Sequence, residues 1–126
     1  MNYIIDSYAW IEYLDGTEKG EKVKEVLTEQ NLIHTTAITV AEVVSRAKRK
    51  DKDTVIAYQT VTTNSNVINI NSEIAKETGL LHAEIKKEIK DFGLADAFVL
   101  LTARKLGAKI VTGDPHFKGF EEAILI

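Results

Sequence analysis

Short apolar runs alternate along the chain with longer segments in which apolar residues recur every three or four positions. The short runs predict buried strands at residues 3–5, 32–36, 66–70, 109–112 and 123–126. The longer segments predict helices at residues 7–15, 18–27, 39–50, 54–61, 72–89 and 94–106, with Asp51 or Asp53 capping the fourth and Asn71 or Ser72 the fifth. The chain therefore alternates between strands and helices.

This alternation is typical of the α/β class, in which helix layers cover both faces of a mostly parallel sheet. We expect a three-layer α/β/α fold with right-handed crossovers between parallel strands. Pro115 is the only proline, and no Gly/Ser-rich stretch separates two parts of the 126-residue chain. We therefore expect a single domain over residues 1–126.

Four acidic residues stand where a strand should end or a helix should begin, namely Asp6, Glu42, Asp96 and Asp114. In a sheet with right-handed crossovers, these places meet at the edge formed by the carboxyl ends of the strands, where ligands bind. Each acid also has a purely structural interpretation as a helix cap or a turn former. Glu42, for example, follows Thr39 by three residues, which is the spacing of a capping box.

Together, the four acids favour a metal site, because carboxylates gathered at one edge repel one another unless a divalent cation lies between them. Ligation by oxygen alone suits Mg²⁺ or Mn²⁺. The chain has no cysteine, and no histidine accompanies the acids in zinc-motif spacing. His116 is the histidine nearest the predicted edge, and it could contact a phosphate or have only a packing role.

The charge distribution leaves room for a nucleic-acid substrate. The net charge is −3, and without the four acids the balance is 16 − 15 = +1. Basic residues cluster at positions 46–50 and 86–90, which could contact phosphates or could be solvated helix faces. With no signal peptide, no long apolar stretch and no cysteine, we expect a cytoplasmic protein with no membrane partner.

The four acids lie in the segments IIDSYAWIEYL, ITVAEV, GLADAFVLLTAR and IVTGDPHF. On these four segments, the chain resembles the PIN-domain ribonucleases and, among them, the small VapC-type toxins of toxin–antitoxin pairs. The third and fourth segments together are the most specific, and the likeness extends over essentially the whole chain. The family fold, a parallel sheet flanked by helices, agrees with the pattern described above.

The resemblance implies that Asp6, Glu42, Asp96 and Asp114 are the catalytic acids and bind one or two Mg²⁺ or Mn²⁺ ions. Ser7 and Thr112 match positions where a hydroxyl supports such a cluster. The implied activity is endonucleolytic cleavage of RNA by a homodimer that a cognate antitoxin silences. A PIN nuclease of RNA maturation and a catalytically idle RNA- or protein-binding module are the alternatives.

Three aromatic residues, Tyr8, Trp10 and Tyr13, follow the first acid. Helical spacing places Ile11 and Leu14 toward the core, whereas Trp10 and Tyr13 lie on a different face. That second face could belong to a dimer or antitoxin surface, or it could be partly buried against a neighbouring helix.

Overall fold

A computed structural model describes residues 1–126. A five-stranded sheet with the order β3-β2-β1-β4-β5 forms its centre, and every neighbouring pair is parallel, which confirms the predicted fold class. The strands are β1 (Asn2–Ile5), β2 (Leu32–Thr36), β3 (Asn66–Ile68), β4 (Lys109–Thr112) and β5 (Ala123–Leu125). The assignment of residues 1–126 to one domain stays a prediction.

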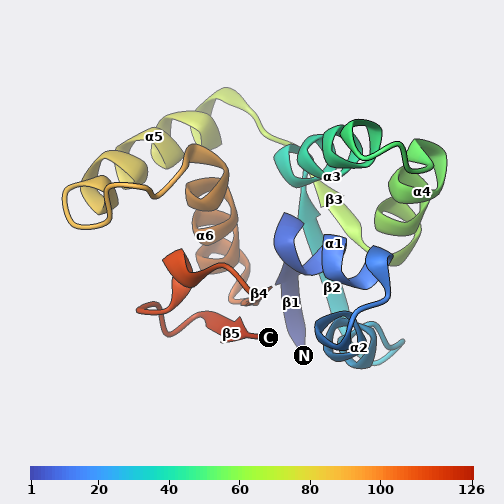
Figure 1. The fold of residues 1–126 in the computed structure, drawn as a ribbon. Coiled ribbons are helices and arrows are strands. Elements are labelled where there is room, and N and C mark those ends of the chain that lie inside the picture. The colour runs from blue at the N-terminus through green and yellow to red at the C-terminus, as the bar shows by residue number, and fades with distance from the viewer.

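Helices cover both faces of this sheet (Figure 1). Four of them pack together on one side: α1 (Ser7–Asp15), α2 (Glu18–Val26), α3 (Ala37–Arg49) and α4 (Thr54–Asn64). The other side carries α5 (Ser72–Lys86), α6 (Leu94–Leu106) and the single-turn helix η1 (Pro115–Phe117). None of the helices is both long and apolar enough to cross a membrane.

The two layers have separate hydrophobic cores because side chains alternate along each central strand. In β1, Ile5 faces the core under α1 to α4, and Ile4 faces the core under α5 and α6. In β4, Val111 and Ile110 divide in the same way. All four side chains are fully buried, as expected for central parallel strands covered on both faces.

Trp10 lies in the core under α1 to α4, so the interpretation that it belongs to a partner surface is wrong. Its side chain is fully buried, and its indole N–H donates a hydrogen bond of 3.0 Å to the Thr35 hydroxyl. Tyr13 packs edge-on against Trp10, with ring centroids 6.1 Å apart. Ile11 and Leu14, which the spacing placed inside, are only partly buried. The helix is covered by the sheet and by α2, α3 and α4, so a pattern with one buried face does not describe it.

Side-chain caps set most helix starts, and one of them corrects a prediction. The Thr36 hydroxyl accepts a hydrogen bond of 3.1 Å from the Thr39 amide, so α3 begins at Ala37 rather than at Thr39. Glu42 therefore lies in the second turn of α3, and the capping-box interpretation for this residue is wrong. Of the alternatives left open, Asp53 caps α4 and Asn71 caps α5.

Two elements end two or more residues before the limits that the sequence predicts. Strand β3 ends at Ile68 instead of residue 70, and α5 ends at Lys86 instead of residue 89. The amides of Glu88 and Ile89 still bond back to the Ile85 carbonyl, and Ile89 packs against the second core. Packing continues past the end of the helix there, which is why the apolar spacing extends beyond it.

The connections bring distant parts of the chain to one edge of the sheet. Asp6 directly follows β1, α3 begins directly after β2, and Asp114 follows β4. Because α6 precedes β4, its first turn lies at this same carboxyl edge. Any site built at this edge combines residues from across the whole sequence.

Candidate functional site

Asp6 is held firmly between β1 and α1. Its carboxylate accepts a hydrogen bond of 2.9 Å from the Ala9 amide and another from the Thr112 hydroxyl, and the residue is 4% exposed. Burial raises the pKa of Asp6 to about 7. The hydrogen bonds lower it in part, and the nearby carboxylates of Asp114 and Asp96 raise it further. The Asp6 carboxyl group therefore exchanges its proton near neutral pH.

Thr112, at the end of β4, connects two of the predicted acids. While its hydroxyl donates to Asp6, it accepts a hydrogen bond of 3.0 Å from the Asp114 amide. Asp114 in turn caps η1, and its carboxylate accepts a bond of 2.9 Å from the His116 amide. The fully buried Thr112 thus fixes the position of both Asp6 and Asp114.

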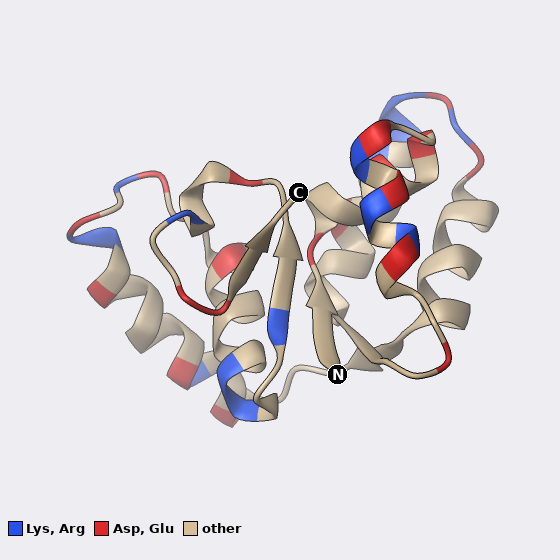
Figure 2. Cartoon of the chain, turned by 90° about the horizontal axis from the view of Figure 1, so that it is seen from below, with Lys and Arg blue, Asp and Glu red and all other residues tan.

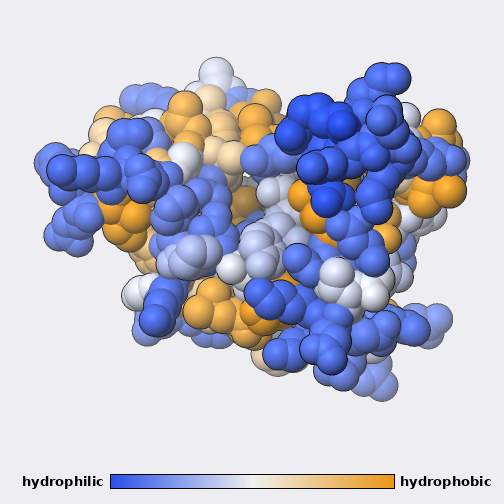
Figure 3. All heavy atoms as spheres, viewed as in Figure 1, coloured by the Kyte–Doolittle hydropathy of each residue, from blue (hydrophilic) through white to orange (hydrophobic).

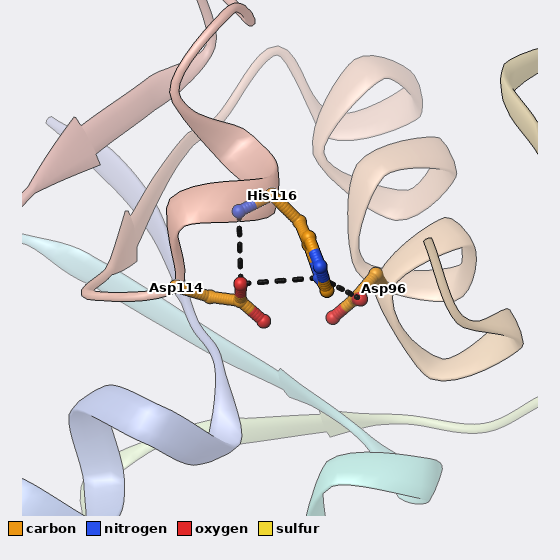
Figure 4. Close-up of side chains that lie close together, drawn as sticks. All are labelled: Asp96, Asp114 and His116. Atoms are coloured by element: carbon orange, nitrogen blue, oxygen red, sulfur yellow. Dashed lines mark hydrogen bonds and ion pairs between the residues drawn. The ribbon is translucent and has the colours of Figure 1, made fainter. Parts of the chain in front are cut away.

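Asp96 is the third residue of α6 and has a double role. Its carboxylate accepts a hydrogen bond of 3.3 Å from the Gly93 amide, as in a capping box. It also faces Asp114 and His116 (Figure 4). Partial burial raises the pKa of Asp96, and the Asp114 charge raises it further, whereas the Gly93 amide and His116 lower it. Asp96 therefore lies in the first turn of α6, as its structural interpretation expected, and also belongs to the site.

His116 completes the tightest group of potential ligands. Its Nδ1 atom lies 3.3 Å from Asp114 Oδ1 and 3.7 Å from Asp96 Oδ2, and one ligand atom from each of the three residues lies within 4.8 Å of the other two. The sequence pointed to this histidine without assigning it a role. The sequence feature that could have indicated its role is its position two residues after Asp114. The single turn η1 brings the His116 side chain back toward Asp114, the residue that caps this turn.

Glu42 and Asp6 lie outside that tight group. Burial raises the pKa of Glu42, the Ser7 hydroxyl lowers it, and the charges of Asp96 and Asp114 raise it, so Glu42 is within electrostatic reach of both acids. The surface is hollowed between the side that carries α5 and α6 and the side that carries α1 and α3 (Figure 3). Glu42 and Ser7 belong to α3 and α1, whereas Asp96 belongs to α6.

Tyr8 packs against Gly113, the residue between Thr112 and Asp114. A Cβ atom on Gly113 would lie 2.1 Å from Tyr8 Cε1, so the tyrosine ring packs directly on the backbone between Thr112 and Asp114. The Lys19 ammonium donates a hydrogen bond of 2.9 Å to the Tyr8 hydroxyl. The Lys19 ammonium therefore lies at the outer end of the Tyr8 side chain.

The two basic clusters are divided between ion pairs and free side chains. Arg46 pairs with Asp15 at 3.0 Å, and Lys87 pairs with Glu84 at 3.3 Å. The cluster around residues 48–50 is exposed, as are Lys86 and Lys90. Helix α2 carries acidic and basic residues along its length, whereas α4 carries none (Figure 2).

The donor set fits a divalent cation. Asp96 and Asp114 offer carboxylate oxygens, and the buried Nδ1 atom of His116 has no hydrogen-bond partner. Neighbouring negative charges raise the pKa values of Asp6, Glu42 and Asp96 beyond the effect of burial. A bound Mg²⁺ or Mn²⁺ would offset that repulsion and give Nδ1 a partner.

Comparisons with known proteins agree with this fold. The family model described as "PIN domain" matches residues 3–122. Among solved structures, a chain of a toxin–antitoxin complex from Klebsiella pneumoniae is 26% identical, with a TM-score of 0.73, and the match covers 97% of this chain and 95% of that one.

Two further structures are similar at lower identity. VapBC2 from Rickettsia felis, described as bound to a DNA fragment from its promoter, is 21% identical with a TM-score of 0.74 and coverages of 100% and 98%. VapC20 from Mycobacterium tuberculosis, described as a Sarcin-Ricin loop cleaving toxin, is 15% identical with a TM-score of 0.77 and coverages of 95% and 97%. A comparison with curated protein sequences finds no significant match.

Proposed function

Because the chain belongs to the PIN domain family, we propose that it is a metal-dependent endoribonuclease that hydrolyses phosphodiester bonds in RNA. The observation that carries this proposal is the approach of Asp96 and Asp114 to within ligand distance of a common point, with Asp6 joined to Asp114 through Thr112. The three acids come from different segments, so helix capping alone gives no reason for them to meet.

Each residue has a role that follows from its surroundings. Asp96 and Asp114 would hold an Mg²⁺ or Mn²⁺ ion, and Asp6 and Glu42 would complete that site or serve a second ion. When bound, such an ion neutralises phosphate charge and makes a water molecule more acidic. Thr112 orients Asp6 and Asp114, and Ser7 orients Glu42. Products with a 5′-phosphate and a 3′-hydroxyl are expected.

We also propose that this nuclease is the toxin of a toxin–antitoxin pair that acts in the cytoplasm. The likeness to a chain of the Klebsiella pneumoniae complex supports this role over RNA maturation. An idle binding module is less consistent with the site, because such a module does not need three acids whose pKa values are raised by burial and by neighbouring carboxylates.

Exposed apolar side chains support protein partners, for which we propose a second copy of the chain and an antitoxin. On α4, Val55, Ile56 and Tyr58 are each more than half exposed. Beside them, a pocket of about 190 Å³ opens between α1, α3 and α4, with six of its ten lining residues hydrophobic. Apolar groups gathered on one helix are typical of protein interaction sites.

Asp96→Asn tests the proposed function. The amide keeps an oxygen to accept from the Gly93 amide, so α6 remains capped, but the negative charge is lost. We expect Mn²⁺-dependent cleavage of labelled RNA to fall on the order of 100-fold, which corresponds to about 3 kcal/mol of transition-state stabilisation.

The matched control is Asp91→Asn, which changes an exposed aspartate outside the site and should leave the rate nearly unchanged. Thermal melts of both variants check that the fold is intact. Wild-type cleavage by Asp96→Asn, or cleavage by the native chain that persists in EDTA, would remove the assignment.

A further inference from the structure

We propose that His116 supplies a nitrogen ligand to the metal site and biases the site toward Mn²⁺ over Mg²⁺. This inference rests on the proposed metal dependence and deepens it, because carboxylates alone do not distinguish strongly between these two ions. It concerns Nδ1 of the histidine that follows Asp114 by two residues.

The distances fit a shared ion better than a hydrogen-bond network. Nδ1 lies 3.3 Å from Asp114 Oδ1 and 3.7 Å from Asp96 Oδ2. With bonds of about 2.1 Å, neighbouring ligand atoms of an octahedral ion lie about 3 Å apart and opposite ones about 4.2 Å apart. Both observed distances lie within this range, whereas the longer one exceeds that of a hydrogen bond.

Nδ1 is also a buried polar atom without a hydrogen-bond partner. It has no hydrogen bond and is shielded from water, although the His116 side chain as a whole is 33% exposed. A buried polar atom without a partner is uncommon and needs a reason. An ion between Nδ1 and the two carboxylates provides one, with the ring proton then on Nε2.

The imidazole ring is fixed in this orientation. The His116 amide donates to Asp114 Oδ1 at 2.9 Å, which holds the backbone of the single turn. The ring packs edge-on against the fully buried Phe92, with centroids 6.5 Å apart. Nδ1 therefore faces the acids without first having to be ordered by an ion.

A nitrogen ligand changes which ion the site favours. Mg²⁺ strongly prefers oxygen ligands and keeps much of its water, whereas transition metals accept imidazole readily. Replacing the nitrogen by oxygen should therefore weaken Mn²⁺ binding more than Mg²⁺ binding. His116→Asn makes this replacement, because the asparagine amide can place an oxygen where Nδ1 now lies.

The test uses the full chain without RNA and Mn²⁺ as the probe. Pulsed electron paramagnetic resonance detects modulation of the bound Mn²⁺ signal by a directly coordinated ¹⁴N nucleus. We expect the modulation of one imidazole in the native protein and none in His116→Asn. Calorimetry should show Mn²⁺ affinity falling about tenfold and Mg²⁺ affinity changing less than about twofold.

His82→Gln is the matched control. His82 Nε2 bonds to the Phe92 carbonyl at 2.9 Å, and glutamine can place a donor at that point. This variant should keep the ¹⁴N modulation and both affinities.

Other outcomes overturn the inference in distinguishable ways. Mn²⁺ that binds without ¹⁴N modulation would remove His116 as a ligand, while metal dependence would survive. If the native protein shows no ¹⁴N modulation and His116→Asn nevertheless cleaves RNA more slowly, the histidine would instead be a contact for the substrate. No binding of either ion to the native chain would remove the proposed metal dependence together with this inference.

Discussion

Asp6 and the group formed by Asp96, Asp114 and His116, here called the open group, lie at the same edge of the sheet but in different surroundings. Asp6 is 4% exposed and accepts two hydrogen bonds from its own chain. In the open group, the side chains of Asp96 and Asp114 are 22% and 27% exposed. One carboxylate is fixed from within, and the others can be reached from solvent.

The contrast suggests a division of work within one site. A buried carboxylate bonded on both oxygens hardly moves, so it can serve as a fixed reference point, but its charge is costly in the absence of a cation. Partly exposed carboxylates and an imidazole can take up and release an ion. The Thr112 hydroxyl contacts both Asp6 and the Asp114 amide, so it fixes the position of Asp6 relative to the open group.

Asp6→Asn should produce the largest effect on this contrast. Between pH 4 and 7 the folded metal-free protein holds a proton on Asp6 that the unfolded chain releases, so the free energy of unfolding falls as pH rises through this window. Asparagine mimics the protonated acid and lacks this dependence. Because the pKa of Asp6 is raised from 3.8 to about 7, the stability of the variant relative to the native chain should grow by up to about 4 kcal/mol from pH 4 to pH 8.

Urea denaturation at a series of pH values in EDTA measures this difference. RNA cleavage by the variant should fall on the order of 100-fold at the same time. Glu42 and Asp96 also have raised pKa values, but they contribute to both proteins and cancel in the comparison. Parallel stability curves for the two proteins would mean that Asp6 titrates as a solvated carboxyl group does.

Thr112→Val should have the next largest effect, because it removes the hydrogen bonds that link Asp6 to the open group. Valine keeps the shape of threonine but can neither donate to Asp6 nor accept from the Asp114 amide. Two buried groups then lose a partner, which should lower the free energy of unfolding by about 2 kcal/mol and reduce Mn²⁺ affinity.

Thr112→Ser is the control for this change, because it keeps the hydroxyl. Its metal affinity, measured by calorimetry, should stay close to that of the native chain. Equal affinities in the valine and serine variants would show that the hydroxyl does not link Asp6 to the open group.

Gly113→Ala should have the smallest effect, at the open group alone. The new methyl group would meet the Tyr8 ring, whose outer end reaches the surface and can shift. We expect a loss of about 1 kcal/mol, at the low end of the range for overpacking, and a smaller loss when Tyr8 is first changed to Ala.

Gly79→Ala is the matched control for the glycine change. This glycine lies within α5, and a methyl group added to it would point into open space, so alanine there should stabilise the chain by about 0.5–1 kcal/mol. Thermal melts of the native chain, the single variants and the double variant Gly113→Ala/Tyr8→Ala give the change in stability at each glycine. Additive effects at Gly113 and Tyr8 would contradict the contact between them.

The sequence predicted the sheet and its carboxyl edge well, because these follow from local signals and general topology. Helix α6 and strand β4 match their predicted limits, since Gly107 stops the helix in a left-handed conformation and β-branched residues follow. Right-handed crossovers then bring α6 and the residue after β4 to the same edge. Neither step requires knowledge of side-chain contacts.

What the sequence did not provide depends on such contacts. The burial of Trp10 follows from helices on several sides of α1, which its spacing cannot encode. Two hydroxyls could cap α3, and only the observed bond selects Thr36 over Thr39. The position of His116 depends on one helical turn that returns it to Asp114. In each case, local pattern leaves more than one packing arrangement open.

The central position of β1 has a consequence for protein synthesis. Thr112, which holds Asp6 in place, leaves the ribosome 106 positions after it. Until β4 has emerged and paired with β1, a nascent chain has an incomplete sheet and no ordered acidic edge. The proposed cleavage of RNA would therefore begin only once the chain had grown past Asp114. Prematurely terminated products would lack this activity.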